Sequence, residues 1–279
     1  MARAGRTVGV NAGAASTSRA ALNRVALPIE HGAWGFLLEP ALLGLVLARS
    51  GAGVARACVA LCTLLLQTPV SLIAADARRG KVFPRTRLAR RVALGYALAG
   101  FAGLAAAWAL AGDLVWMLPA LFALPLAAVQ LNYDARNRAR ELVPEAAGAV
   151  AIGALAACIA VAAGWALAPA LALWGLLALR AVPAIVYVRA RLRLERGTPG
   201  SAVPTWSLHA AELAVGGVAW AAGWLAWPVV AAYALLAARA AWGLSRWRRP
   251  VAAKVVGFGE LAYGVATVLL LAAGVAWVG

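Results

Sequence analysis

Acidic residues and histidines interrupt several long apolar stretches of this 279-residue sequence. Glu39 follows His31 by eight positions, which places it about 12 Å further along a helix at 1.5 Å per residue. An ionised side chain costs roughly 2.5 to 3.5 kcal/mol at the centre of a membrane helix, so each such group needs a partner or a wet cavity. We therefore expect the polar residues of these stretches to share one cavity. The prediction covers His31, Glu39, Asp76, Tyr133, Glu145, His209 and Glu212.

His209 and Glu212 are three positions apart, so they share one face of a helix. There the carboxylate could orient or charge the imidazole, as in a general base. The pair also fits a plain helix start, with Ser207 as the cap and a loop arginine beside Glu212. Both interpretations stay open at this point.

Arg180 and Arg239 lie near the middle of apolar stretches, too deep to reach the membrane interface easily. We expect each to pair with a buried acid. Glu39 is the first candidate for Arg180. Such pairs are also common as scaffolding, so the pairing alone does not imply a function.

The composition identifies a membrane protein. Apolar residues make up 64% of the chain and charged residues only 13%, whereas soluble proteins carry about 25% charged residues. The net charge of +16 would suggest a nucleic acid partner in a soluble chain. Membrane proteins, however, concentrate Lys and Arg in cytoplasmic loops, so we predict the lipid bilayer and no nucleic acid as partner.

Nine apolar windows have the length of about 20 residues that a membrane-spanning helix requires. They predict an all-α, polytopic transmembrane bundle, because the backbone must satisfy its own hydrogen bonds in lipid. Residues 27–279 then form a single transmembrane domain, after a disordered, basic cytoplasmic tail at 1–26. The windows are approximately 31–49, 54–75, 92–111, 114–132, 143–163, 166–188, 207–225, 227–244 and 258–278.

The basic residues are distributed unevenly over the predicted connections. The tail and the even-numbered loops hold 22 of them, whereas the odd-numbered connections hold only Arg49 and Arg56. Positively charged loops stay in the cytoplasm. We therefore expect a protein of the cytoplasmic (inner) membrane, with the N-terminus in the cytoplasm and the C-terminus outside.

Two stretches resemble the YwiC-like family of bacterial membrane proteins. The first is LPIEHGAWGFLLEPALLG at Leu27–Gly44, which contains the HGAW signature before an apolar helix with proline. The second is NYDARNRARELVPEAAGA at Asn132–Ala149. The resemblance implies a membrane protein, and it carries no biochemical activity with it.

A more distant likeness is to the UbiA superfamily of intramembrane prenyltransferases, which has nine helices and functional loops after the second and sixth. Those enzymes carry an Asn-Asp-x-x-Asp motif and then an Arg-Thr-x-x-Arg stretch, followed by a Tyr, Arg and Leu-x-x-Glu pattern after the fourth helix. The likeness implies an enzyme that transfers a prenyl group. The matching residues here are Asp76, Arg85, Thr86, Arg87, Arg90, Tyr133, Arg136, Arg140, Leu142 and Glu145.

The sequence departs from that pattern where the enzymes hold Mg²⁺. Ala75 replaces the Asn, Arg79 replaces the second Asp, and Glu195 is the lone acid of the loop after the sixth helix. Because a diphosphate needs Mg²⁺ held by several carboxylates, we predict no intact metal site, and the cofactor stays unknown with Mg²⁺ at Asp76 as the remaining option. Arginines could clamp the phosphates instead, or they are ordinary cytoplasmic-side residues that contact anionic lipid.

The first hypothesis is a protein that binds an isoprenoid or another anionic lipid-like ligand in a cavity facing the cytoplasm, as a possible divergent prenyltransferase. The second is a transporter of a small anion or a proton-coupled solute, with Glu39, Arg180 and Glu212 along its path. The third is a non-catalytic assembly or lipid-binding factor. The predicted catalytic residues are Asp76, Glu145, His209 and Glu212, and the predicted ligand-binding residues are His31, Glu39, Arg79, Arg85, Arg87, Tyr133, Arg136, Arg140, Arg189 and Arg193.

Overall fold

The computed structural model describes residues 22–27, 31–136 and 138–277, and in that part of the chain the regular secondary structure is entirely helical. The all-α prediction is confirmed. Most of the predicted tail, residues 1–21, lies outside the described residues. The elements are α2 (His31–Leu47), α3 (Gly51–Arg78), α4 (Pro84–Ala111), η1 (Val115–Met117), α5 (Leu118–Ala135), α6 (Leu142–Ala162), α7 (Leu167–Glu195), α8 (Val203–Ala221), α9 (Trp227–Leu244) and α10 (Ala253–Ala276).

Seven helical segments of the described chain are long and apolar enough to cross a membrane. They are α3, α4, η1 with α5, α6, α7, α9 and α10. The apolar part of α2, Trp34–Leu47, is shorter than a full span. The expectation of a multi-pass membrane protein is confirmed, and the two remaining predicted windows correspond to α2 and α8.

Helix α8 buries polar residues and exposes apolar ones, the reverse of a surface helix in a soluble protein. Its buried face carries Thr205, His209 and Glu212. Its exposed face carries Val215 and Val218, with Trp206 and Trp220 beside them. An apolar face suits contact with lipid, while the polar face requires partners inside the protein. The buried polar residues lower the hydropathy of α8, which is not among the seven apolar segments.

The chain divides into two compact units, each described here by itself. The first unit holds the described residues up to Ala33 together with Cys58–Ala105, which include most of α3 and α4. The second holds Trp34–Ala57 and the rest of the chain from Ala106.

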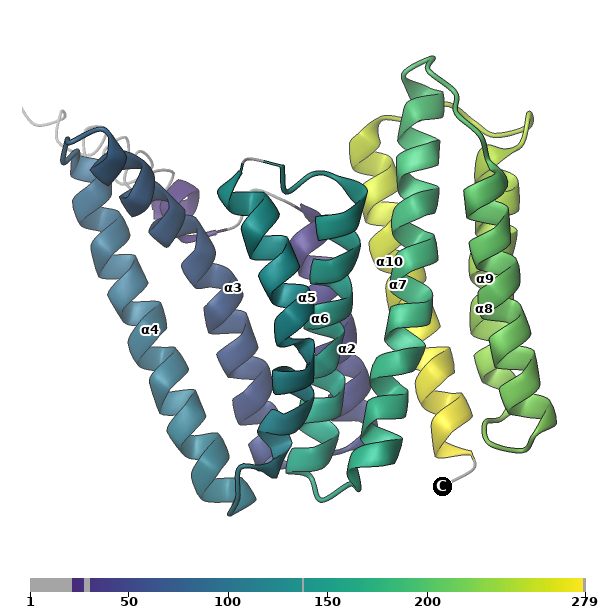
Figure 1. The fold of residues 1–279 in the computed structure, drawn as a ribbon, viewed down its shortest axis with the longest axis horizontal. Coiled ribbons are helices and arrows are strands. Elements are labelled where there is room, and N and C mark those ends of the chain that lie inside the picture. Colours follow the sequence, from purple (N-terminus) through teal and green to yellow (C-terminus); the bar gives the residue numbers. More distant parts are fainter. Residues whose placement is uncertain (1–21, 28–30, 137, 278–279) are drawn as a thin grey trace, which may run out of the picture. The chain divides into compact units, whose positions relative to one another are not determined.

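Within the second unit, neighbouring helices pack in chain order. Helix α6 packs against α5 and α7, and α9 packs against α7, α8 and α10 (Figure 1). The core contains Leu43 of α2, Leu173 of α7, Tyr233 of α9 and Leu271 of α10. The hydroxyl of Tyr233 donates to the carbonyl of Leu176 at 3.1 Å, so this buried phenol ties α9 to α7.

Two glycines set the α8–α9 hairpin. Gly223 adopts a φ of 74°, a left-handed conformation that glycine takes without steric cost, and it lets the chain reverse after α8. A Cβ at Gly216 would lie 2.8 Å from the ring of Tyr233. The absence of that Cβ allows α8 to approach α9 closely, which brings the polar face of α8 into the interior.

Candidate ligand-binding site

Glu39 of α2 and Arg180 of α7 form a buried ion pair. Glu39 is 6% exposed and Arg180 is 3% exposed. Gly264 of α10 provides the room for this pair, because a Cβ there would lie 2.8 Å from Arg180 Nη2 and against Glu39 Oε1. The predicted partnership of Glu39 and Arg180 is confirmed.

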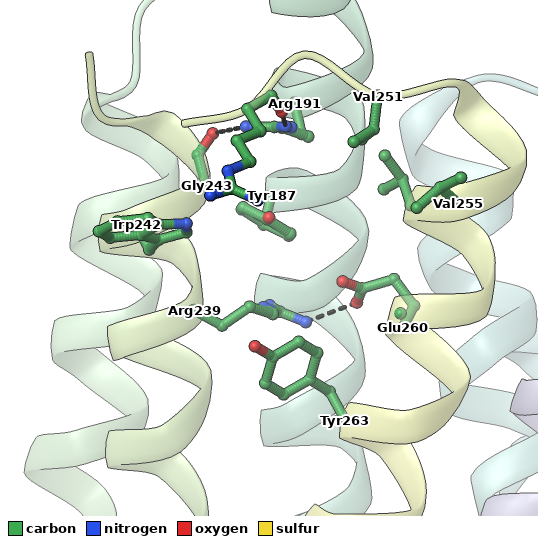
Figure 2. A pocket seen from close by; sticks show the side chains of 12 residues that line it. Tyr187, Arg191, Arg239, Trp242, Gly243, Val251, Val255, Glu260 and Tyr263 are labelled. Carbon is green, nitrogen blue, oxygen red and sulfur yellow. Dashed lines mark hydrogen bonds and ion pairs between the residues drawn. The ribbon is translucent and has the colours of Figure 1, made fainter. Parts of the chain in front are cut away.

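A second ion pair joins Arg239 of α9 to Glu260 of α10. The guanidinium carbon of Arg239 lies 4.2 Å from the ring centre of Tyr187 and 5.7 Å from that of Tyr263 (Figure 2). Arg239 is 5% exposed. Its Nε and Nη2 make no hydrogen bond with any residue that the structure describes. Two donor nitrogens of this arginine are therefore buried without a partner among the described residues.

His209 and Glu212 lie on the buried face of α8, with His209 Nδ1 3.1 Å from Glu212 Oε1. The interpretation of this pair as a helix start is wrong. Helix α8 begins at Val203, and the hydroxyl of Ser207 donates to the carbonyl of Pro204 instead of capping. Arg180 and Arg239 interact electrostatically with Glu212, so the pair belongs to the same buried group of charges.

A pocket of about 410 Å³ opens where α7 and α9 end and α10 begins. Figure 2 shows Arg239, Glu260 and Tyr263 on its inner side and Trp242, Val251 and Val255 around it. Three arginines line it: Arg191, Arg239 and Arg249.

Arg191 is held in place at the wall of this pocket. It donates to the carbonyls of Gly243 and Arg249, the latter at 2.7 Å, and it pairs with Glu195 at 2.8 Å. A Cβ at Gly243 would overlap the hydroxyl of Tyr187, so this glycine lets α9 pass close to α7. The pocket thus has a fixed cationic wall.

Asp76, predicted as catalytic, lies in the first unit and is fully buried. Arg85 Nη2 donates to it at 2.6 Å, and the hydroxyl of Thr86 donates to it at 2.6 Å. Arg79 and Arg87 are exposed. The carboxylate therefore joins the end of α3 to the start of α4. Among the described residues no three His, Cys, Asp or Glu side chains are placed to hold one metal ion.

Other predicted residues gather around the loop between α5 and α6. Arg189 of α7 donates to Glu145 at 2.6 Å and to the carbonyl of Arg140 at 2.9 Å. The guanidinium of Arg138 lies over the ring of Tyr133, 5.3 Å from its centre. Arg136 and Arg193 are exposed. These residues form a separate polar group in the second unit.

The pocket is lined by residues that the prediction did not select. None of the described residues in the predicted set lines it, and the side chain of His31 lies outside what the structure describes. The signal for Arg239 was present, since its depth in an apolar stretch required a buried acid, and Glu260 is that acid. Tyr187 and Tyr263 sit in apolar stretches without any sequence pattern that marks them.

Comparison with protein families gives one finding for this chain. Residues 27–160 match the family model described as YwiC-like protein. The predicted YwiC-like resemblance is confirmed over that stretch, which ends in α6. The pocket residues of α7, α9 and α10 lie beyond it. Neither the curated proteins nor the solved structures give a match.

Proposed function

We propose that this YwiC-like, multi-pass membrane protein binds the anionic headgroup of a lipid-like amphiphile in the pocket between α7, α9 and α10. The observation that carries the proposal is Arg239. It is buried at the pocket, and its Nε and Nη2 bond to no residue in the described part of the chain. Guanidinium groups bind phosphate and carboxylate oxygens in a two-pronged geometry, so Arg239 suits an oxyanion.

The volume and charge of the pocket support this class of ligand. About 410 Å³ falls within the range of small-molecule sites. Among the described residues, its lining contains Arg191, Arg239 and Arg249 against Glu260 as the one acid, and Glu195 next to the lining pairs with Arg191. An anion therefore gains more from this lining than a neutral or cationic headgroup does.

The rim of the pocket supports an apolar tail on that ligand. Trp242 is 62% exposed and Val255 is 55% exposed. Both side chains line the pocket. In a bilayer such surfaces contact acyl or isoprenoid chains, so a ligand can place its headgroup at Arg239 and leave its tail in lipid.

The pocket is proposed to open to the cytoplasm. The ends of α7 and α9 that frame it continue into basic connections, with Arg196 after α7 and Arg246 and Arg248 after α9. Positively charged connections remain on the cytoplasmic side. The same charges would concentrate an anionic lipid near the opening.

Binding has more support than prenyl transfer, the activity that the UbiA likeness implies. Asp76 accepts hydrogen bonds from Arg85 and Thr86, and Glu145 is paired with Arg189. Both carboxylates are therefore engaged in local contacts. An isoprenoid phosphate remains a suitable ligand, since it combines an oxyanion with an apolar tail.

Native mass spectrometry of the purified protein tests the proposal with added phosphatidic acid or phosphatidylcholine. We expect phosphatidic acid to bind in preference to the zwitterionic lipid, and Arg239→Gln to remove that preference. Arg246→Gln is the matched control, because Arg246 is exposed and outside the pocket lining. Equal retention of both lipids by the unmodified protein, or an equal loss in both variants, would exclude an anion site at Arg239.

A second candidate function is transport of a small anion or a proton-coupled solute. The Glu39–Arg180 and Glu260–Arg239 pairs favour it, because they place charges inside helices α2, α7, α9 and α10. Intramembrane charges often mark ion pathways. Proteoliposomes that move an anion across the bilayer, with a rate that falls in Arg180→Met together with Glu39→Leu, would favour this candidate over ligand binding alone.

A further inference from the structure

We infer that Glu212 is a buried proton-binding site, with its carboxyl O–H donating to Nδ1 of His209. The inference goes beyond the proposed lipid binding and does not depend on it. His209 and Glu212 are 1% and 0% exposed, and His209 Nδ1 lies 3.1 Å from Glu212 Oε1.

The distribution of charges around Glu212 carries the inference. The two arginines whose charges act on Glu212, Arg180 and Arg239, are already paired with other carboxyl groups, those of the buried Glu39 and the partly exposed Glu260. Arg180 binds Glu39, and Arg239 binds Glu260. In the part of the chain that the structure describes, His209 is the one basic side chain within ion-pair distance of Glu212. An ionised Glu212 would leave the group with an uncompensated negative charge.

A proton on the pair removes that charge, and the surroundings decide where it sits. Arg180 of α7 and Arg239 of α9 interact with Glu212, Tyr233 of α9 does so as well, and Glu260 of α10 interacts with His209. An ion pair of Glu212 with an imidazolium would require both ions to be desolvated inside the protein. A neutral carboxyl hydrogen-bonded to the ring avoids these costs, since burying ions is far more costly than burying neutral polar groups.

Two further polar groups are associated with the pair. His209 interacts electrostatically with Glu260, and Glu260 lines the pocket. Thr205 lies one turn before His209 on the same face, and its hydroxyl bonds to no residue among those described. We expect this proton to exchange with water, so that it behaves as a reversibly bound ligand.

Infrared difference spectroscopy of the purified full-length protein tests the inference. We expect a carboxylic-acid C=O band at neutral pH that shifts when H₂O is replaced by D₂O and is absent in Glu212→Gln. Glutamine has the shape of the protonated side chain, which favours folding of the variant. Glu141→Gln is the control, because Glu141 belongs to the loop contact with Arg138.

His209→Phe provides an independent readout if Glu212→Gln does not fold. Loss of the acceptor at His209 should move the band to higher frequency without removing it. The absence of a carboxylic-acid band in the unmodified protein would overturn the inference, as would a band that persists in Glu212→Gln or does not shift in D₂O. Lipid binding plays no part in these spectra, so the inference and the proposed function fail separately.

Discussion

Two acid–arginine ion pairs of this protein differ in how completely their polar atoms are hydrogen-bonded. Asp76 and Arg85 are nine residues apart and join the end of α3 to the start of α4, with Thr86 completing the hydrogen bonds of the carboxylate. Arg239 and Glu260 come from separate helices, and Arg239 retains two nitrogens that bond to no residue in the described chain. The first contact is complete in itself, while the second has capacity for a further partner.

Buried charges with all their hydrogen bonds made and buried charges with some hydrogen bonds missing therefore have different roles. A buried charge whose hydrogen bonds are all made stabilises local structure and offers little to a ligand. Incompletely bonded charges beside a pocket attract an acceptor, because an unmet buried donor costs free energy. The predictions below separate these roles, beginning with the largest expected effect.

Breaking the Glu39–Arg180 pair should have the largest effect on stability. Arg180→Met alone leaves Glu39 buried without its partner, which should lower the free energy of unfolding by about 3–5 kcal/mol. The double variant Glu39→Leu with Arg180→Met should recover much of that loss, because both charges are gone. Denaturant titration in detergent measures the free energy of unfolding of both variants. If the double variant is less stable than Arg180→Met, an unpaired Glu39 is not the reason for the stability lost in Arg180→Met.

A smaller loss is expected from crowding the same pair without changing its charge. Gly264→Ala introduces a Cβ 2.8 Å from Arg180 Nη2 and against Glu39. Overpacking of this kind costs about 1–3 kcal/mol, and the same denaturant titration will detect it. Gly257→Ala on the same helix has nothing within 4 Å of its new Cβ and serves as the control. Equal stability of the two variants would mean that α10 does not enclose the pair.

The smallest effect should come from the first unit. Asp76→Asn weakens the hydrogen bonds from Arg85 and Thr86, so the melting temperature should fall less than in Arg180→Met. Phosphatidic acid binding should be unchanged, because Asp76 belongs to the α3–α4 contact. Thermal melting and native mass spectrometry on one preparation measure both quantities. Loss of lipid binding in Asp76→Asn would contradict this prediction and would place Asp76 in the ligand site.

The sequence was sufficient to predict the helices and the ion pair between Glu39 and Arg180. Long apolar runs define the helices, and the depth of Arg180 required a buried acid, which Glu39 supplies. It was insufficient for the pocket, because Tyr187 and Tyr263 resemble ordinary apolar positions and meet Arg239 only through packing. Asp76 matched a known motif, yet its nearest donors are Arg85 and Thr86. Local patterns thus predicted elements, while the site depends on which helices pack together.

Photocrosslinking with a diazirine-bearing phosphatidic acid tests the central claim most directly. The headgroup should bind at Arg239, so labelled peptides should come from the ends of α9 and α10 that carry Trp242 and Val255. Excess unlabelled phosphatidic acid should compete, and Arg239→Gln should lose the label. Labelling that instead concentrates on the α3–α4 connection near Arg79 and Arg87, and persists in Arg239→Gln, would contradict the account.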